Sequence, residues 1–205
     1  MADLIQPKLI YLIRRHPAFT RADWTARWRQ HAALGMSLPR WKNVARYVHG
    51  DVVEPRAGQH AYLADHDGVG LIWHRSLAHR AAHFADTSSQ AVMVADEAET
   101  FSDWIANHCL SAREEVLIAP SDAAVVKLMC FLWHDAAVAR PDGTCGHVRN
   151  VPMPGDWGLD CTGIEEFWFA DEDAADAAAK ALGLTGRSLA VLVRDSELYS
   201  IGELL

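Results

Sequence analysis

The chain has 205 residues; half are hydrophobic and 22% are charged, which is typical of a soluble globular protein able to bury a sizeable core. Its net charge of −8 argues against nucleic acid as a partner, because a phosphate-binding surface needs excess Lys and Arg. No apolar stretch is long enough to span a bilayer, and no signal peptide is visible. The four cysteines form no C-x-x-C pair, so we expect a reducing, cytoplasmic compartment and no membrane contact.

The first half of the chain predicts alternating strands and helices. Residues 8–14 are apolar and β-branched, as in a buried strand that Pro17 ends. Thr20 is a predicted helix N-cap, and the helix runs to about Ser37. The remaining predictions are strands at 44–48, 69–74 and 113–118, a helix over 77–89 and a short helical turn over 96–104. The order β-α-β-β-α-β is the ferredoxin-like arrangement.

The second half restarts this pattern after residue 124. Residues 125–134 predict a strand, but residues 140–159 are rich in Pro and Gly, which disfavours the helix expected next. A strand at 164–169, an Ala-rich helix over 172–182 and strands at 189–194 and 197–201 complete the unit. We therefore expect a second ferredoxin-like unit that has lost its first helix.

Two strand signatures occur twice in the same order. Residues 8–13 and 127–132 both begin Lys-Leu, and the strands at 68–73 and 163–168 both run from Gly to Trp over the same interval. Chance similarity of short apolar strands is the alternative to duplication. We predict an α+β fold in which two tandem ferredoxin-like units, residues 1–120 and 121–205, close one pseudo-symmetric antiparallel β-barrel around a cavity.

His31 is the first candidate for chemistry. It shares a helical face with Trp24 and Trp28, so it could act as a general acid or base beside an apolar pocket. A half-buried histidine that orients the helix is the alternative. Arg14 and Arg15 end the first strand, and by alternation one of them should face the barrel and hold a substrate oxygen. The alternative is that both arginines simply lie at a strand end exposed to solvent.

Aromatic residues predict the walls of the pocket. Tyr11, Trp24, Trp28, Tyr47 and Trp73 suit a flat hydrophobic ligand, although core packing explains many such residues. His79 and His83 lie four residues apart on a predicted helix and are a weak candidate for a metal site. A pair of surface histidines is the favoured alternative.

Several segments of the first half form a pattern known from one family. They are Leu12-Ile13-Arg14-Arg15-His16-Pro17, Phe19-Thr20-Arg21-Ala22-Asp23-Trp24 and Trp28-Arg29-Gln30-His31-Ala32, followed by the Gly68–Trp73 strand, Asp96-Glu97 with Phe101, and Glu114-Glu115-Val116. With these segments the first half resembles the EthD-like family of the dimeric α+β barrel superfamily. The resemblance covers about residues 8–118 and implies that the histidine at position 31 lies near the cavity. Family chains usually contain one unit and form homodimers, whereas this chain is expected to contain two; a homodimer stays possible if strand edges remain free.

Residues and resemblance together predict a cofactor-independent transformation of a small hydrophobic or aromatic metabolite inside the barrel. An isomerase, dehydratase, decarboxylase or monooxygenase reaction would fit, with His31 moving a proton and Arg14 or Arg15 holding an oxyanion. One alternative is a non-catalytic binding or accessory protein for a hydrophobic ligand. Another is a haem protein, since some members of the wider superfamily use haem.

Overall fold

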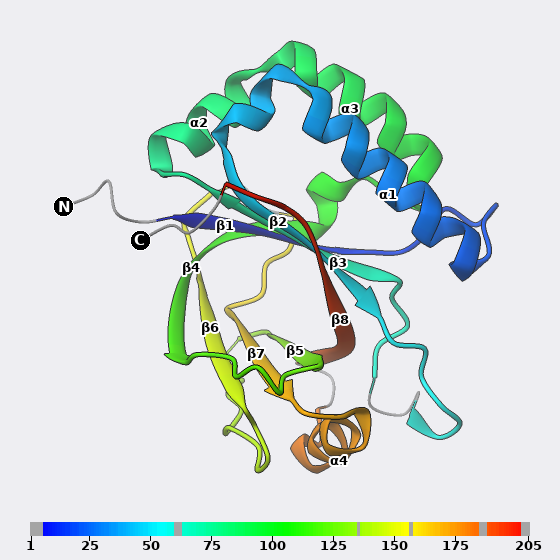
Figure 1. The fold of residues 1–205 in the computed structure, drawn as a ribbon, viewed down its shortest axis with the longest axis vertical. Coiled ribbons are helices and arrows are strands. Elements are labelled where there is room, and N and C mark those ends of the chain that lie inside the picture. Colours follow the sequence, from blue (N-terminus) through cyan, green and yellow to red (C-terminus); the bar gives the residue numbers. More distant parts are fainter. Residues whose placement is uncertain (1–5, 60–62, 135, 156–157, 185–187, 202–205) are drawn as a thin grey trace.

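The first half of the chain forms four antiparallel strands with three α-helices on one face (Figure 1). The computed structural model describes residues 6–59, 63–134, 136–155, 158–184 and 188–201. Within this half the strand order is β4-β1-β3-β2. The elements are β1 (Pro7–Ile13), α1 (Arg21–Ser37), the 3₁₀ helix η2 (Pro39–Asn43), β2 (Val44–Val52), β3 (Gly68–His74), α2 (Leu77–Ala85), α3 (Thr87–Thr100), the 3₁₀ helix η4 (Ile105–His108) and β4 (Cys109–Ile118).

The second half forms four more strands with one helix. Their order, β8-β5-β7-β6, repeats the order of the first half, with the fourth strand of the unit beside its first. The described residues between β5 and β6 contain no helix, as predicted. The elements are β5 (Val126–Leu132), β6 (Gly146–Pro152), β7 (Gly163–Phe169), α4 (Glu172–Leu182) and β8 (Ser188–Ser200).

The two units close into a single eight-stranded barrel. Closure follows because β2 pairs with β8 and β4 pairs with β6, both antiparallel. The predicted α+β barrel of tandem ferredoxin-like units, the second without its first helix, is therefore confirmed. The division at residue 120 stays a prediction, and the closed sheet leaves no free edge among the described strands for a second copy to extend.

The strand pairing repeats residue for residue between the halves. In the first half Lys8 lies opposite Trp73, and β1 ends opposite Gly68. In the second half Lys127 lies opposite Trp168, and β5 ends opposite Gly163. The repeated signatures of the sequence are thus the same hydrogen-bonded ladder built twice.

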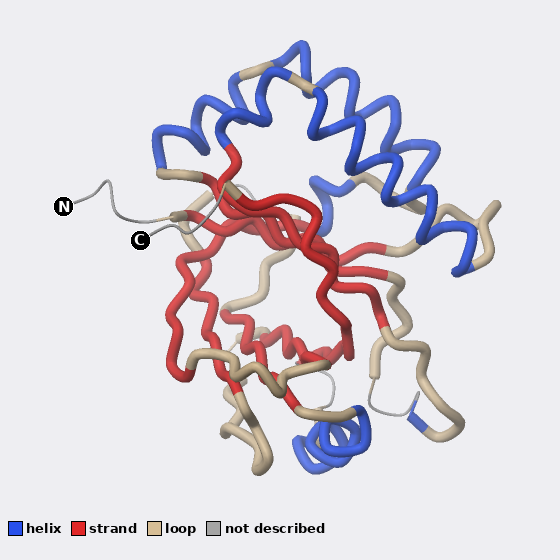
Figure 2. The backbone as a smooth tube through the Cα atoms, in the orientation of Figure 1, coloured by secondary structure: helices blue, strands red, loops and turns tan. Residues whose placement is uncertain are grey.

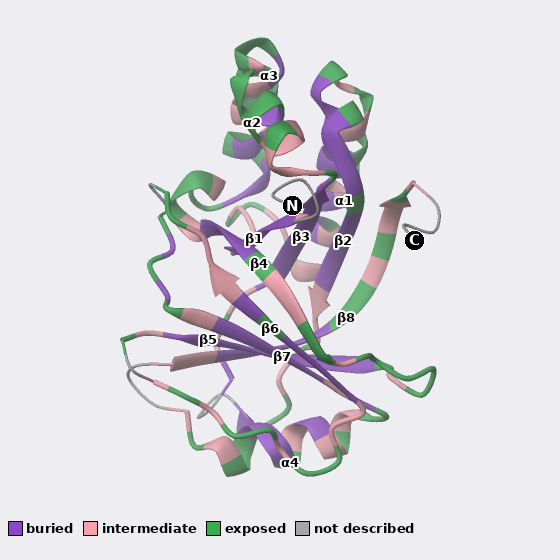
Figure 3. Ribbon diagram, turned by 90° about the vertical axis from the view of Figure 1, so that its left-hand side faces the viewer, coloured by how far each residue is buried: buried purple, intermediate pink, exposed green. Residues whose placement is uncertain are grey.

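Three apolar clusters divide the core by layer. Alternate residues of strands from both halves, among them Ile10, Phe131 and Val193, fill the barrel interior together with Leu159 and Cys161 from the β6–β7 loop. A second cluster lies between the first unit's strands and α1, and a third lies between the second unit's strands and α4. Figure 2 shows the strands enclosed between these two helical layers, and Figure 3 shows buried residues along the strands and on the barrel-facing side of α4.

Charged side chains also lie inside the barrel, where the two halves meet. Glu166 contacts the ammonium groups of both Lys8 and Lys127, and all three side chains are almost fully buried. Lys8 also pairs with Glu114 at 2.7 Å, and Lys127 pairs with Asp195 at 2.8 Å. We call these five residues the ionic seam. Each lysine also lies over its own tryptophan, at 4.5 Å for the Trp73 ring and 5.0 Å for the Trp168 ring.

Some predicted elements need correction. The short helical turn over 96–104 is wrong, because a full helix, α3, runs from Thr87 to Thr100 and is capped by the Asp86 side chain, so that α2 ends earlier, at Ala85. β6 lies within the segment read as loop, and the last two predicted strands are one strand, β8. Within the described part of the chain, no helix has the length and apolar character needed to cross a membrane.

Candidate functional site

A cavity of about 430 Å³ lies between the helices of the first unit and the outer face of its sheet. Leu9 and Tyr11 of β1 form part of its floor, and His31 and Ala32 of α1 form part of its wall. At its mouth, Phe84 is 40% exposed and Trp104 is 56% exposed. This volume is in the usual range for small-molecule sites.

The position of this cavity corrects the expectation of a pocket inside the barrel. Leu9 and Tyr11 alternate with Ile10 and Leu12, so they face the helices while the other pair faces the barrel axis. The interior is occupied by the first apolar cluster and the ionic seam. The space for a ligand is therefore on the outer face of the sheet, beneath α1, α2 and α3.

Helix α1 places His31 in the cavity wall. Thr20 caps the helix by accepting the Asp23 backbone N–H at 3.2 Å, as predicted, and helical spacing puts His31 on the buried face with Trp24 and Trp28. The His31 Nδ1 lies 2.6 Å from an Asp96 carboxylate oxygen. The Nδ1–H therefore donates to Asp96, which leaves Nε2 as the nitrogen available to the cavity.

The electrostatics favour His31 as a neutral base. Burial lowers its pKa, and the hydrogen bond and charge of Asp96 only partly oppose this. Asp96 has a pKa below its ordinary value, since hydrogen bonds from Arg27 and His31 outweigh the effect of burial. The pair thus holds an unprotonated imidazole in a fixed tautomer beside an ionised carboxylate, an arrangement suited to general-base chemistry.

A chain of hydrogen bonds runs from α1 through β2 to Tyr11 in the cavity floor. The hydroxyl oxygens of Tyr11 and Tyr47 lie 2.7 Å apart, and the Tyr47 hydroxyl lies 2.6 Å from His49 Nε2. His49 Nδ1 is bonded to the guanidinium of Arg29, which in turn pairs with Asp51. We call Tyr11, Tyr47, His49 and Arg29 the tyrosine relay.

The direction of every bond in the tyrosine relay follows from Arg29. A guanidinium can only donate, so His49 Nδ1 accepts and His49 Nε2 carries the proton. His49 then donates to Tyr47, and Tyr47 donates to Tyr11. The Tyr11 O–H is left to donate to an acceptor in the cavity. Burial raises the pKa of Tyr11 and of Tyr47 and lowers that of His49, so all three stay neutral near pH 7.

Two glycines of β3 make room for these side chains. The Tyr11 ring lies across β3 to reach Tyr47 on β2, and a Cβ at Gly70 would meet that ring at 1.8 Å. A Cβ at Gly68 would meet the Trp28 ring at 2.6 Å. The Gly-Val-Gly start of β3 is therefore required by the close approach of two aromatic rings.

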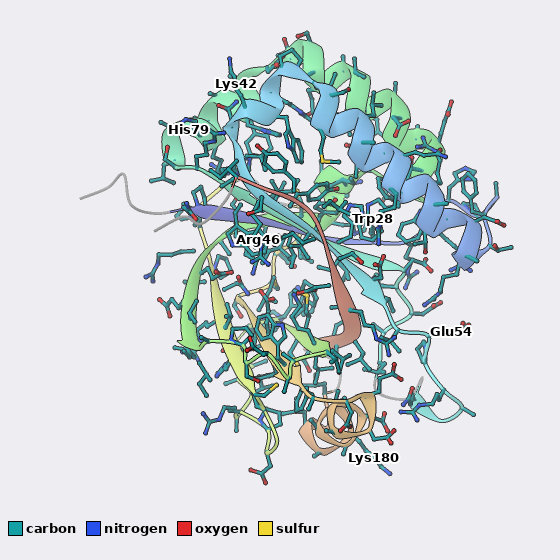
Figure 4. The ribbon with its side chains drawn as sticks, viewed as in Figure 1. Trp28, Lys42, Arg46, Glu54, His79 and Lys180 are labelled. Atoms are coloured by element: carbon teal, nitrogen blue, oxygen red, sulfur yellow. The ribbon has the colours of Figure 1, made fainter. Side chains whose placement is uncertain are left out.

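The predicted aromatic residues separate into different roles. Tyr11 and Tyr47 line the cavity on the outer face of the sheet, not one inside the barrel. Trp28 lies between α1 and the sheet (Figure 4) and stacks on His49 with ring centroids 3.5 Å apart, while the Trp24 indole N–H donates to the Thr100 carbonyl at 2.8 Å. Trp24 and Trp28 therefore pack against residues of the site and are not among the residues that line the cavity. Trp73 lies in the barrel, where its indole N–H donates to Glu114 at 3.2 Å.

The structure does not bring Arg14 or Arg15 to the cavity with His31. The exposed Arg14 bonds the Asp65 carbonyl oxygen at 3.0 Å and lines a separate, more polar pocket. Arg15 pairs with the buried Asp67 and also bonds the Phe19 carbonyl oxygen at 3.1 Å. Both side chains brace loops at the barrel rim, where β1 ends.

The two histidines proposed as a weak metal pair are used separately. His79, near the outer end of α2 (Figure 4), lies 2.8 Å from the Ser76 hydroxyl through its Nδ1. His83 is buried against the ring of His74 and lines the cavity. Among the residues that the structure describes, no group of three or more His, Cys, Asp or Glu could hold a metal ion.

Haem binding stays a prediction, and the cavity fits a haem group poorly. His31 is the histidine best placed as an axial ligand, since its Nδ1 bond to Asp96 leaves Nε2 available to the cavity. The cavity of about 430 Å³ lies toward the lower end of the range for small-molecule sites, however, and suits a ligand smaller than a macrocycle.

Several site residues were missed by sequence reasoning. Asp96 and Glu97 belong to an acidic segment that the resemblance had singled out, but no role was given to either. Arg40 and Gln90 line the cavity from η2 and α3, and His49 lies within the tyrosine relay. Pairs of residues far apart in sequence carried no local signal. The Gly-Val-Gly start of β3 was the one local sign that large side chains cross that strand.

Known proteins resemble this chain in part of its sequence and in its whole fold. Residues 16–104 match the EthD domain. No curated protein matches the chain. An anthrone oxidase-like protein of known structure has 12% identity, a TM-score of 0.63 and coverage of 99% of this chain and 96% of its own.

Two further solved structures share the fold. A provisionally assigned monooxygenase from Fusobacterium nucleatum has 7% identity, a TM-score of 0.55 and coverage of 98% of this chain and 97% of its own. A variant chlorite dismutase from Candidatus Nitrospira defluvii, in complex with cyanide, has 10% identity, a TM-score of 0.52 and coverage of 93% and 90%. Residues 16–104 of this chain are therefore similar to the EthD domain, and the chain shares the barrel fold of these solved structures.

Proposed function

We propose that this chain catalyses the oxidation of a flat, enolisable hydroxyaromatic compound by molecular oxygen, using its own side chains for the proton transfers. The reaction would take place in the cavity beneath α1, α2 and α3. The observation that carries the proposal is that an unprotonated His31, held by Asp96, and the open O–H donor of Tyr11 line one mostly apolar cavity. A base and an oxyanion donor together are what enolisation requires.

The chemistry follows from those two groups. His31 Nε2 takes a proton from an acidic C–H of the substrate, and Tyr11 donates a hydrogen bond to the oxygen on which the negative charge collects. The electron-rich carbon then reduces molecular oxygen and forms a C–O bond to it. Collapse of the resulting peroxide breaks the O–O bond. One oxygen atom remains as a new carbonyl, and the other leaves as water with the two hydrogens of the original CH₂ group.

The surroundings support this assignment. Burial keeps Tyr11 neutral, so it acts as a donor and not as a base. The aromatic floor and the Trp104 mouth suit a flat ring system, and the apolar walls exclude water from the reactive anion. The anthrone oxidase-like and monooxygenase neighbours share the fold, which makes an anthrone a reasonable first probe.

The test is oxygen uptake with anthrone and a hydroxylated anthrone as probes, together with the absorbance of the quinone formed. We expect one oxygen molecule consumed for each quinone. His31→Asn should lower kcat by about 10²–10⁴, and Tyr11→Phe by a smaller factor. The matched control is His147→Asn, since His147 is also buried and bonds a carboxylate, Glu165, at 2.7 Å in the second unit.

Three results would contradict the proposal. These are binding of neither probe, equal rates for His31→Asn and wild type, and turnover that persists unchanged without oxygen. The last would assign the site to isomerisation, dehydration or decarboxylation, in which His31 moves a proton without an oxidant.

A further inference from the structure

We propose that the Arg40 end of the cavity binds an ionised oxygen of the ligand, so that the preferred substrate is an aromatic carboxylate or phenolate. This inference rests on the proposed function only in assigning the substrate to this cavity. It adds a second charged contact, separate from the reacting groups His31 and Tyr11, and it predicts a preference among otherwise similar aromatic compounds.

Arg40 is an unusual residue to find in this position. It lies on η2 directly after α1, it is 8% exposed, and its side chain lines the cavity. One of its terminal nitrogens donates to the Gln90 side-chain oxygen on α3. The carboxylates of Glu97 and Asp86 are near enough to raise its pKa against the effect of burial, but no described carboxylate forms an ion pair with it.

A buried guanidinium with only a neutral hydrogen-bond partner is costly. Removing a cation from water carries a large desolvation penalty, which an opposite charge at hydrogen-bonding distance offsets. The planar fork of Arg has five N–H donors and suits two oxygens of a carboxylate. Since Gln90 occupies one terminal nitrogen, the others are available for a ligand anion.

His83 supplies a second, independent sign of a polar ligand at this end. It is 4% exposed and lines the same cavity, yet its Nδ1 has no hydrogen-bond partner among the described residues. Burial and the nearby Arg40 charge lower its pKa to about 4, so the ring is neutral at pH 7. The other ring nitrogen donates to the Arg40 backbone carbonyl, so the unpartnered Nδ1 is an acceptor and suits a hydroxyl group of the ligand.

Apolar side chains join the two ends of the cavity. Trp41, Ile72 and Met93 line it together with Arg40 and His31. A ring system held by these side chains could place its ionised substituent at Arg40 while its enolisable carbon lies at His31. The arrangement fixes which way round the substrate binds, which is what charged groups in apolar pockets commonly do.

Isothermal titration calorimetry with naphthalene carboxylate and the neutral naphthalene carboxamide tests this without any turnover. Wild type should bind the carboxylate about tenfold or more tightly than the carboxamide, as expected for a charge-assisted contact. Arg40→Met should abolish the preference. Gln90→Glu places a carboxylate against the guanidinium without enlarging the cavity, so it should also abolish the preference while carboxamide binding is retained. Arg75→Met, which removes an exposed arginine outside the cavity lining, is the control.

Each other outcome counts against the inference. Equal affinities of wild type for the two probes, or a preference that survives both Arg40→Met and Gln90→Glu, overturns the anion site but leaves the proposed function standing. Binding of neither probe by wild type overturns both, because the cavity would then not accept an aromatic ring.

Discussion

The two halves of the barrel share one ladder but use their outer faces differently. In the second half, α4 places Ala175, Ala178 and Ala179 directly on the sheet, and their small side chains let the helix pack closely. In the first half, Trp24 and Trp28 of α1 lie over the sheet, and the cavity opens beside them.

This difference separates a close-packed helical layer from one that holds a cavity, on two sheets with the same strand register. Alanine at the helix–sheet contact gives a close-packed, inert layer, whereas large rings act as spacers that leave room for a ligand. The tyrosine relay and the His31–Asp96 pair both lie in the half with the large rings.

The largest effect should come from the ionic seam that both halves share. Glu166→Gln leaves Lys8 and Lys127 buried without their common carboxylate, which should cost about 3–5 kcal/mol in the free energy of unfolding. Although burial opposes it, the two lysines lower the pKa of Glu166 from 4.5 to about 2. The stability contributed by Glu166 is therefore present above pH 4.5 and is lost as the pH falls toward 2.

Chemical denaturation at pH 7 and pH 3 measures both parts of this prediction. Glu197→Gln, which removes a surface carboxylate, is the control and should change little. A Glu166→Gln variant as stable as wild type at pH 7 would show that the seam does not hold the halves together.

Alanine-to-leucine substitutions on the two helical layers should differ in how much they lower the free energy of unfolding. Ala175→Leu has no space beneath α4 and should lower the free energy of unfolding by about 1–3 kcal/mol. Ala32→Leu extends into the cavity, so it should leave stability within about 1 kcal/mol of wild type and block the aromatic probes. Thermal unfolding and probe titration check both variants, and equal destabilisation by the two would contradict the spacer interpretation.

The equivalent glycines Gly68 and Gly163 offer a second matched pair. Alanine at Gly68 meets the Trp28 ring at 2.6 Å, whereas alanine at Gly163 meets nothing within 4 Å. Gly68→Ala should cost about 1–3 kcal/mol and disturb the stacking of Trp28 on His49, and Gly163→Ala should stay within about 0.5 kcal/mol of wild type. Denaturation curves with tryptophan fluorescence report both effects, and the reverse order would contradict the duplicated register as described.

The last prediction concerns a buried glutamate, Glu97, whose pKa is shifted in the opposite direction to that of Glu166. Burial raises the pKa of Glu97 from 4.5 to about 6, with Arg40 and Asp96 facing it from η2 and α3, and Tyr11 and Cys109 from β1 and β4. Because its charged form is disfavoured in the folded state, stability falls as the pH rises from 4.5 through 6. Glu97→Gln should therefore stabilise the fold by about 2 kcal/mol at pH 8 and change nothing at pH 4. Stabilisation of the same size at both pH values would rule out titration as the cause.

Much of the fold could be predicted because the sequence repeats it. The Lys-to-Trp register, the Thr20 cap and the missing helix of the second unit all have local signals. Helix α3 was missed because its apolar stripe is weak and polar residues fill its first turn. β6 was missed because Pro and Gly flank a short strand whose interior holds Arg149 and Asn150.

The side of the sheet that carries the site could not be predicted. All seven residues of β1 are buried, since the barrel interior covers one face and the helices cover the other. Alternation therefore cannot tell the two faces apart. Arg40 illustrates the same limit, because nothing near it in sequence distinguishes a cavity cation from one of the other arginines, and its partner Gln90 lies 50 positions away.

The sharing of Glu166 between two lysines has a consequence for how the molecule unfolds. Lys8 comes from the first strand of one unit, whereas Lys127 and Glu166 both belong to the other, so the Lys8–Glu166 contact crosses between the units. Separating the units would take Glu166 away from Lys8 and would break the β2–β8 and β4–β6 pairings that close the barrel. We therefore expect the barrel to melt in a single cooperative transition, with no stable half, although the two units repeat the same strand signatures.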